Sequence, residues 1–105
     1  MRIDVFRATG DGYAQDVTEG VEVAKIVAAL LSNSPGVVEI DFAGVIAVER
    51  VFLFGLFNSL YLQFSVDELH TRIRFKNLGD FEFVVRRCAV LSLESVLKIQ
   101  SSSAT

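Results

Sequence analysis

The order of apolar and polar residues along the chain predicts three main strands. Residues 2–7 alternate apolar and polar side chains, and the turn residues 9–12 would fold this strand back onto a short strand around Tyr13. This predicts an N-terminal hairpin. The alternating, largely β-branched or aromatic segments 37–42 and 71–76 predict two further strands.

Segments with helical periodicity separate these strands. The first helix is expected to begin after Asp16, because Asp16 and Glu19 have the spacing of a capping box, and to end near Ser32. Its core face is predicted from apolar residues at three- and four-residue spacing: Val17, Val21, Ala24, Ala28 and Leu31. Two more helices and a last short helix or turn are expected at 49–65, 81–91 and 93–99.

The later strands each have one apolar and one charged side. Glu39 and Asp41 share a side of 37–42, whereas 71–76 carries only basic residues on its polar side. Parallel sheets covered on both faces need strands that are apolar almost throughout, so this alternation predicts an α/β fold with helices on one face of the sheet. The helix at 49–65 is long enough to return the chain parallel to the preceding strand.

Length and composition indicate one cytoplasmic domain. We expect residues 1–100 to form a single domain and residues 101–105, which have nothing to pack against, to be disordered. With 51% hydrophobic and 22% charged residues, the composition excludes disorder as the main state. No secretory signal and no apolar run of ~20 residues is found, which predicts a cytoplasmic protein that does not enter a membrane.

The sequence offers no recognisable reaction centre. The net charge of −3 and the scattered basic residues argue against nucleic acid as a partner. His70 stands alone and is interpreted as a strand-edge histidine, Cys88 as a small core residue, and Glu39 with Asp41 as a solvated or ion-paired couple. We therefore expect no catalytic, cofactor or metal site.

The helix at 49–65 is apolar on two sides. Its first stripe comprises Leu53, Leu56, Phe57, Leu60 and Phe64. Its second stripe comprises Val51, Phe54, Tyr61 and Leu62. One sheet cannot cover both, so the second stripe is either buried beneath the other helices or part of an interaction surface.

Four segments carry a resemblance to a known family. They are the strand and turn VEIDFAGV at 38–45, the helix RVFLFGLF at 50–57, a strand ending in Asn77, and the helix VVRRC at 84–88. In this order and spacing, over roughly residues 12–92, the chain resembles the STAS-like domains of unknown function, relatives of the anti-sigma factor antagonists. The resemblance implies a mixed sheet of about four strands with helices mainly on one face, and a role in bacterial partner switching.

The resemblance also identifies a regulatory position that this chain has changed. In the antagonists, a Ser in the loop that opens the second helix is phosphorylated to release an anti-sigma kinase. Here residues 47–51 read Ala-Val-Glu-Arg-Val and contain no hydroxyl group. Either regulation by phosphorylation has been lost, or Glu49 supplies a permanent negative charge at the helix N-terminus, where the helix dipole stabilises an acidic group. A simple capping role for Glu49 is the plainer alternative.

The leading hypothesis is a non-enzymatic protein-interaction module whose partner is an anti-sigma factor or a kinase-like ATPase. Its candidate contact residues are Gly44, Val48, Glu49, Arg50, Val51, Phe54, Tyr61 and Leu62. Two alternatives stay open. One is a structural homodimer through the second stripe, and the other is a small-ligand-binding domain.

Overall fold

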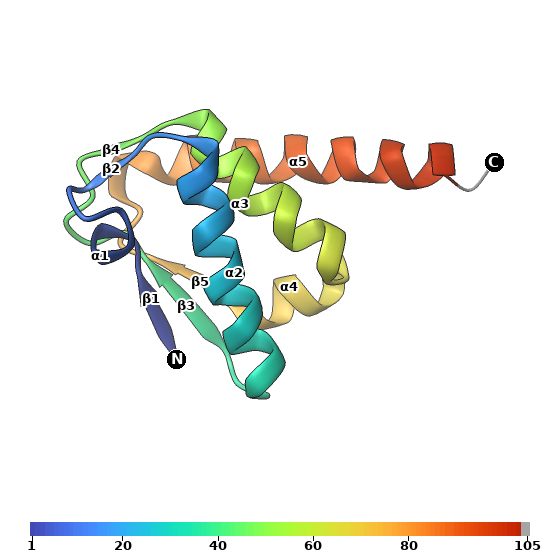
Figure 1. Cartoon of the computed structure of the whole chain (residues 1–105), viewed down its shortest axis with the longest axis horizontal. Coiled ribbons are helices and arrows are strands. Elements are labelled where there is room, and N and C mark those ends of the chain that lie inside the picture. The colour runs from blue at the N-terminus through green and yellow to red at the C-terminus, as the bar shows by residue number, and fades with distance from the viewer. Residues whose placement is uncertain (104–105) are drawn as a thin grey trace.

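The computed structural model describes residues 1–103, with side chains described through residue 101 (Figure 1). The elements follow in the order β1 (Arg2–Asp4), α1 (Val5–Thr9), β2 (Tyr13–Ala14), α2 (Val17–Asn33), β3 (Val38–Asp41), β4 (Ala47–Val48), α3 (Arg50–Gln63), α4 (Val66–Arg72), β5 (Ile73–Lys76), the 3-10 helix η1 (Gly79–Phe81) and α5 (Glu82–Ser103).

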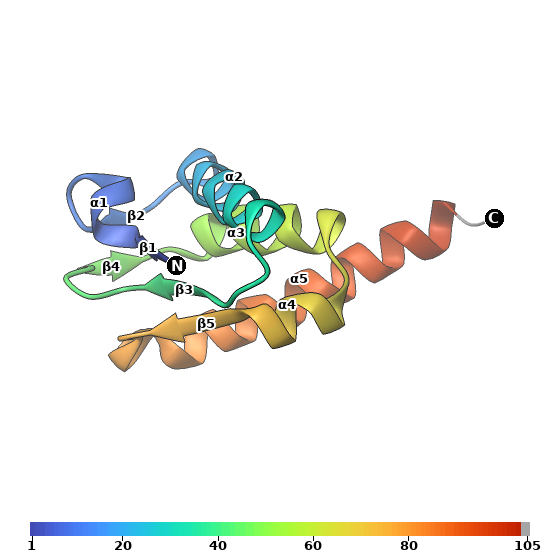
Figure 2. The same cartoon turned by 90° about the horizontal axis from the view of Figure 1, so that it is seen from below.

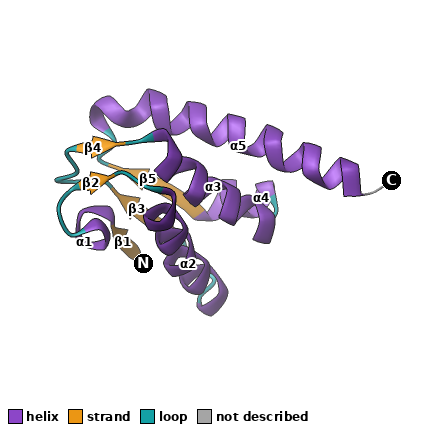
Figure 3. Cartoon of the chain, turned by 45° about the horizontal axis from the view of Figure 1, so that its top comes forward, coloured by secondary structure: helices purple, strands orange, loops and turns teal. Residues whose placement is uncertain are grey.

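The strands form two small parallel sheets. In the larger one, β3 lies between β1 and β5, and Ile40 is in register with Ile3 on one side and Phe75 on the other. In the smaller one, β2 pairs with β4 (Figure 3). The expected single mixed sheet of about four strands is therefore wrong, because all pairs are parallel and the strands divide three and two.

The predicted N-terminal hairpin is also wrong. The chain leaves β1 as a short helix, α1, because the side chain of Asp4 accepts a hydrogen bond from the Arg7 backbone N–H at 3.4 Å and caps the helix. Gly10 ends α1 in the left-handed conformation at φ +83°, with its N–H bonded to the Phe6 carbonyl at 3.0 Å. Gly10, interpreted as part of a hairpin turn, thus ends a helix.

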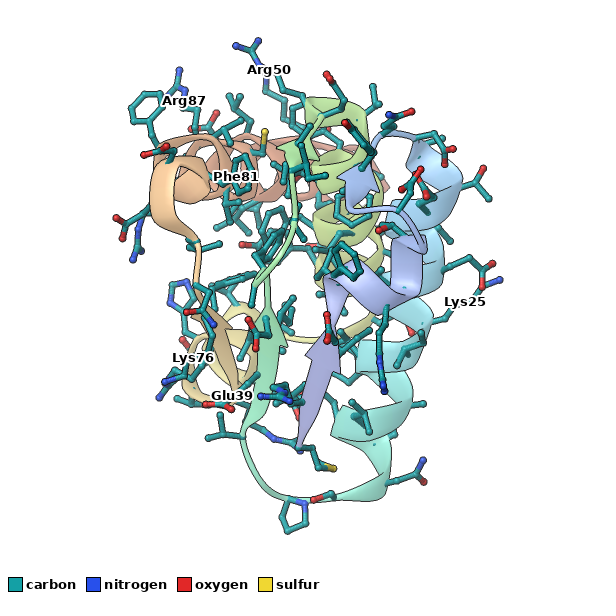
Figure 4. All side chains as sticks on the ribbon, turned by 90° about the vertical axis from the view of Figure 1, so that its left-hand side faces the viewer. Lys25, Glu39, Arg50, Lys76, Phe81 and Arg87 are labelled. Carbon is teal, nitrogen blue, oxygen red and sulfur yellow. The ribbon has the colours of Figure 1, made fainter. Side chains whose placement is uncertain are left out.

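The larger sheet has one apolar and one charged face, as the alternation predicted. On the apolar face the ring of Phe75 packs against those of Phe42 and Phe57, with centroids 6.4 and 5.8 Å away. On the other face, Lys76 Nζ lies 3.5 Å from the Glu39 carboxylate, and both side chains come together there in Figure 4. Acid on β3 and base on β5 therefore meet across the uncovered face.

Helix α2 begins as predicted but buries a shifted face. The Asp16 carboxylate accepts a hydrogen bond from the Glu19 N–H at 2.8 Å, and the Glu19 carboxylate accepts one from the Asp16 N–H at 3.3 Å, which confirms the capping box. Val17, expected in the core, is 53% exposed. The buried residues of α2 are Gly20, Val23, Ala24, Val27 and Leu31.

Two glycines bring α2 and α3 into close contact. A Cβ atom on Gly20 would collide with the Phe52 carbonyl oxygen of α3. A Cβ atom on Gly55 would lie 2.6 Å from the Val17 carbonyl oxygen of α2. Because each glycine faces the backbone of the other helix, α3 packs against α2 at a distance that no larger residue permits.

The segment after α3 departs from the predicted strand at 71–76. Ser65 caps the helix α4 by accepting a hydrogen bond from the Glu68 N–H at 3.1 Å, and β5 begins only at Ile73. Arg72, at the end of α4, donates to the carbonyl oxygens of Ser34 and Gly36. The unpredicted helix therefore places Arg72 where it anchors the turn between α2 and β3.

The last helix is one continuous element. Helix α5 spans 22 residues instead of ending near Leu91, and its C-terminal turns extend past the rest of the molecule (Figures 1 and 2). Of the residues expected to be disordered, 101–103 form the end of α5, and 104 and 105 lie outside the described residues. No helix within residues 1–103 is long and apolar enough to cross a membrane.

Candidate protein-contact surface

The loop from β3 to α3 is held against β2 by backbone hydrogen bonds. A turn closes where the Val45 N–H donates to the Phe42 carbonyl at 3.0 Å. The Ile46 N–H then donates to Gly12 and the Glu49 N–H to Ala14, each at 2.8 Å. These contacts fix the path of the loop up to the first residue of α3.

The ring of Phe6 braces this loop from α1. A Cβ atom on Gly12 would lie 3.0 Å from the ring, and one on Gly44 would lie 3.2 Å from it. Both glycines also have φ of +82°, a conformation that side chains disfavour. This role of Phe6 was not predicted, because residues 2–7 were assigned to a strand.

The loop and the start of α3 present the first part of the predicted contact set. Gly44, Glu49 and Arg50 are exposed, Val51 is 53% exposed, and Figure 4 shows Arg50 pointing away from the body. Val48 is half-buried. Ile46, which was not among the predicted contact residues, is 59% exposed and extends this surface. We call residues 44–51 the loop surface.

Glu49 occupies the N-cap position of α3 without capping it through its side chain. Its backbone carbonyl accepts the Leu53 N–H at 3.3 Å. Among the described residues, the Glu49 carboxylate makes no capping hydrogen bond. The predicted side-chain cap is therefore not formed, and the carboxylate is exposed at the positive end of the helix dipole.

The second stripe does not form one surface. Phe54 and Tyr61 are half-buried and pack against the core, and the Tyr61 ring stacks on Phe57 at 6.2 Å. Burial raises the pKa of Tyr61. Leu62 is 57% exposed, but it lies eleven residues along α3 from Val51, roughly 16 Å away. The structure therefore separates Leu62 from the loop surface and places most of the stripe's aromatic area inside the molecule.

Asp41 ties the beginning of the loop to the end of β5. It is only 7% exposed, and its Oδ1 atom accepts hydrogen bonds from the Asn77 side chain at 2.8 Å and the Ala43 N–H at 2.9 Å. These two bonds, the Asn77 bond first, hold the pKa of Asp41 below its ordinary value of 3.8 against the opposing effect of burial. The charges of Arg2 and Lys76 act in the same direction as the hydrogen bonds.

This linkage predicts a pH-dependent contribution of Asp41 to stability. The pKa of Asp41 in the folded protein lies below 3.8. Asp41 therefore stabilises the fold at pH values above its pKa in the unfolded chain, and this stabilisation is lost as the pH falls through its pKa in the folded protein. Asn77 has φ of +58°, so Asn77→Gly removes the amide without straining the backbone. In Asn77→Gly we expect the Asp41 pKa, measured by NMR titration of its carboxyl carbon, to rise toward 3.8 and the acid-dependent loss of stability to shrink. An unchanged pKa would contradict the assigned cause.

An apolar groove of about 500 Å³ lies against α3 and shares no lining residue with the loop surface. It runs between α3, α4, β5 and α5, with Phe57, Tyr61, Phe75 and Leu93 among its lining residues. His70 lies on this groove, on α4 and not on a strand edge as predicted. Polar groups around it are few, so the groove suits an apolar molecule.

The other residues considered from the sequence, Cys88, Glu39 and Asp41, lie in the core or in pairwise contacts. Cys88 is 1% exposed, which confirms it as a core residue, and burial raises the pKa of its thiol. Glu39 pairs with Lys76, and Asp41 with Asn77. Within the described part of the chain, no group of three or more His, Cys, Asp or Glu side chains is arranged to hold a metal ion.

Comparison with protein families identifies the domain. Residues 19–80, which are 62 of the 105 residues, match the model of the STAS-like domain of unknown function (DUF4325). The chain belongs to this family. The match to the STAS-like domain includes β3, the loop surface, α3 and Asn77, whereas β1, α1, β2 and α5 lie outside it. A search of curated proteins and a search of solved structures each found no match.

Proposed function

We propose that this STAS-like domain is a non-enzymatic interaction module that binds a protein partner through the loop surface, in the manner of the anti-sigma factor antagonists. The observation that carries the proposal is the position of Glu49. It sits at the N-terminus of α3, in the loop where the antagonists hold their regulatory Ser, and its carboxylate is exposed.

The surface around Glu49 has the composition of a contact site. Ile46 and Val51 are more than half exposed at 59% and 53%, and the backbone bonds to Gly12 and Ala14 hold the loop in place before a partner arrives. A preordered loop loses less conformational entropy on binding. The fixed charge of Glu49 favours a partner with a basic group opposite α3, and we propose an anti-sigma factor or a kinase-like ATPase.

Photo-cross-linking tests the site. A benzophenone amino acid in place of Ile46 should form an adduct with such a partner in cells, identified by mass spectrometry. The matched control replaces Ile26, which is 46% exposed on α2, and should not form this adduct. Glu49→Lys should abolish the Ile46 adduct. Equal adducts from both positions, or an adduct indifferent to Glu49→Lys, would refute the proposal.

A partner that is also a kinase should not modify the loop. Residues 42–50 contain no Ser, Thr or Tyr, so we expect no phosphate there after incubation with a cognate kinase and ATP. Mass spectrometry of the peptide containing Glu49 would detect any phosphate on these residues. Detection of a phosphate in this segment would contradict regulation by a fixed charge.

The apolar groove favours small-ligand binding as a second candidate function. Its volume of about 500 Å³ falls in the range of small-molecule sites. Binding of the fluorescent apolar probe anilinonaphthalene sulfonate should then fall in Ala89→Leu, which narrows the groove, and not in Ala29→Leu, which changes an exposed position on α2. Equal probe fluorescence in both variants would exclude this function for the groove.

A further inference from the structure

Helix α5 carries an apolar line on the side that faces away from the core. Phe83 is 81% exposed, Val90 49% and Leu97 50%. We call these three residues the outer stripe. The buried residues of the same helix are Val85, Cys88, Ser92 and Val96. Seven residues are close to two helical turns, so the outer stripe runs along the helix with a drift of only ~20° per step, as in a coiled-coil seam.

We propose that two copies of the chain pair through the outer stripe, with their α5 helices antiparallel and the two-fold axis at Val90. Phe83 lies seven residues before Val90 and Leu97 seven residues after it. An antiparallel copy centred on Val90 therefore places Phe83 of each chain against Leu97 of the other. The stripe is complementary to itself, as a two-fold interface requires.

The charges beside the stripe fit the same arrangement. Arg87 and Glu94 lie on one flank of the stripe, three residues before and four residues after Val90. Antiparallel helices bring equal flanks together, which places each Arg87 beside the second copy's Glu94. Both residues are exposed, and neither forms an ion pair within residues 1–101, where Arg86 instead pairs with Glu82 at 3.0 Å. Figure 4 shows Arg87 pointing away from the body.

The shape of the molecule leaves room for the second helix. The outer stripe spans roughly 21 Å along α5, and the last turns of the helix extend past α3 and α4 in the views of Figures 1 and 2. A second α5 would cover the exposed face of these turns. The outer stripe shares no residue with the loop surface, so failure of this proposal would leave the proposed loop-surface contact untouched. Val90 also lines the edge of the apolar groove.

Sedimentation analysis of the full chain tests the pairing. We expect a reversible dimer whose dissociation constant rises roughly tenfold or more in Leu97→Glu. The matched control is Leu62→Glu on α3, because Leu62 is 57% exposed and Leu97 50%, and it should leave the constant unchanged. Circular dichroism would verify that both variants are folded. A monomer up to millimolar concentration, or a dimer indifferent to Leu97→Glu, would overturn the proposal.

Charge reversal and disulfide trapping test the orientation. Arg87→Glu should weaken the dimer, and adding Glu94→Arg to it should restore the affinity. Val90→Cys should form a disulfide-linked dimer on oxidation because the two positions meet at the axis. Phe83→Cys should not, because Phe83 faces Leu97. Equal disulfide formation at both positions would refute the antiparallel arrangement. It would also be refuted if the double variant Arg87→Glu with Glu94→Arg formed a weaker dimer than Arg87→Glu alone.

Discussion

Replacing Gly20 with alanine is expected to destabilise the protein by about 3 kcal/mol, although alanine is the better helix former. The added Cβ would collide with the Phe52 carbonyl oxygen and lie 3.0 Å from the Leu56 nitrogen. Both atoms belong to the backbone of α3 and cannot rotate away as a side chain can. Relief therefore requires α2 to move off α3, which opens the core along the whole contact.

The sign of this effect separates packing from helix propensity. Propensity alone predicts that Gly20→Ala stabilises the chain by about 1 kcal/mol. Urea unfolding would measure the difference, with Gly36→Ala as the control because its Cβ would meet only the Ser34 hydroxyl at 3.8 Å. Gly55→Ala should resemble Gly20→Ala. Stability of Gly20→Ala at or above wild type would show that the two helices do not pack this closely.

Sequence patterns correctly located the helices and strands that are determined by residues close together in the chain. The capping box of Asp16 and Glu19 correctly placed the start of α2, and the apolar run after Glu49 placed α3 within two residues at each end. The alternation of 37–42 correctly assigned Ile40 to the core and Glu39 to the open face. In each case neighbouring residues supply the capping bonds or the periodicity.

The sequence failed where one signal has two structural uses. Gly10 and Gly12 suit a hairpin turn, but they equally suit a helix end and a close approach of Phe6. The parallel pairing of β2 with β4 joins residues more than thirty positions apart, so no local pattern indicates it. The alternation of 71–76 likewise concealed the short helix that ends at Arg72.

The candidate contact surface was predicted only in part, because contacts between residues far apart in the chain also decide which of its side chains are exposed. The loop from Gly44 to Arg50 was predicted with the help of the family resemblance, and the structure holds it in one defined path against β2. The second stripe was drawn on an isolated helix, without the neighbours that half-bury Phe54 and Tyr61. Periodicity shows which residues share a face, but the packing of other helices decides how much of that face remains exposed.

Truncation of the central strand should cost far more stability than truncation of the charged face. Ile40 is fully buried in the middle of the sheet, between Ile3 and Phe75, so Ile40→Ala leaves a cavity and is expected to lose about 2–5 kcal/mol. Arg74 is exposed, and within residues 1–101 its guanidinium bonds only to the nearby carbonyls of His70 and Ile73. Arg74→Ala should therefore remain within about 0.5 kcal/mol of wild type.

The comparison of Ile40→Ala with Arg74→Ala tests whether the charged face is open in solution. Phe75→Ala provides a third point. Phe75 lies on the apolar side of the same strand as Arg74, and its ring contacts Phe42 and Phe57. We expect its thermal midpoint to fall well below that of Arg74→Ala. If all three variants lost similar stability in calorimetry, Arg74 would have to be buried as well, and the face formed by Arg74, Lys76 and Glu39 would be covered, contrary to the fold described for one chain.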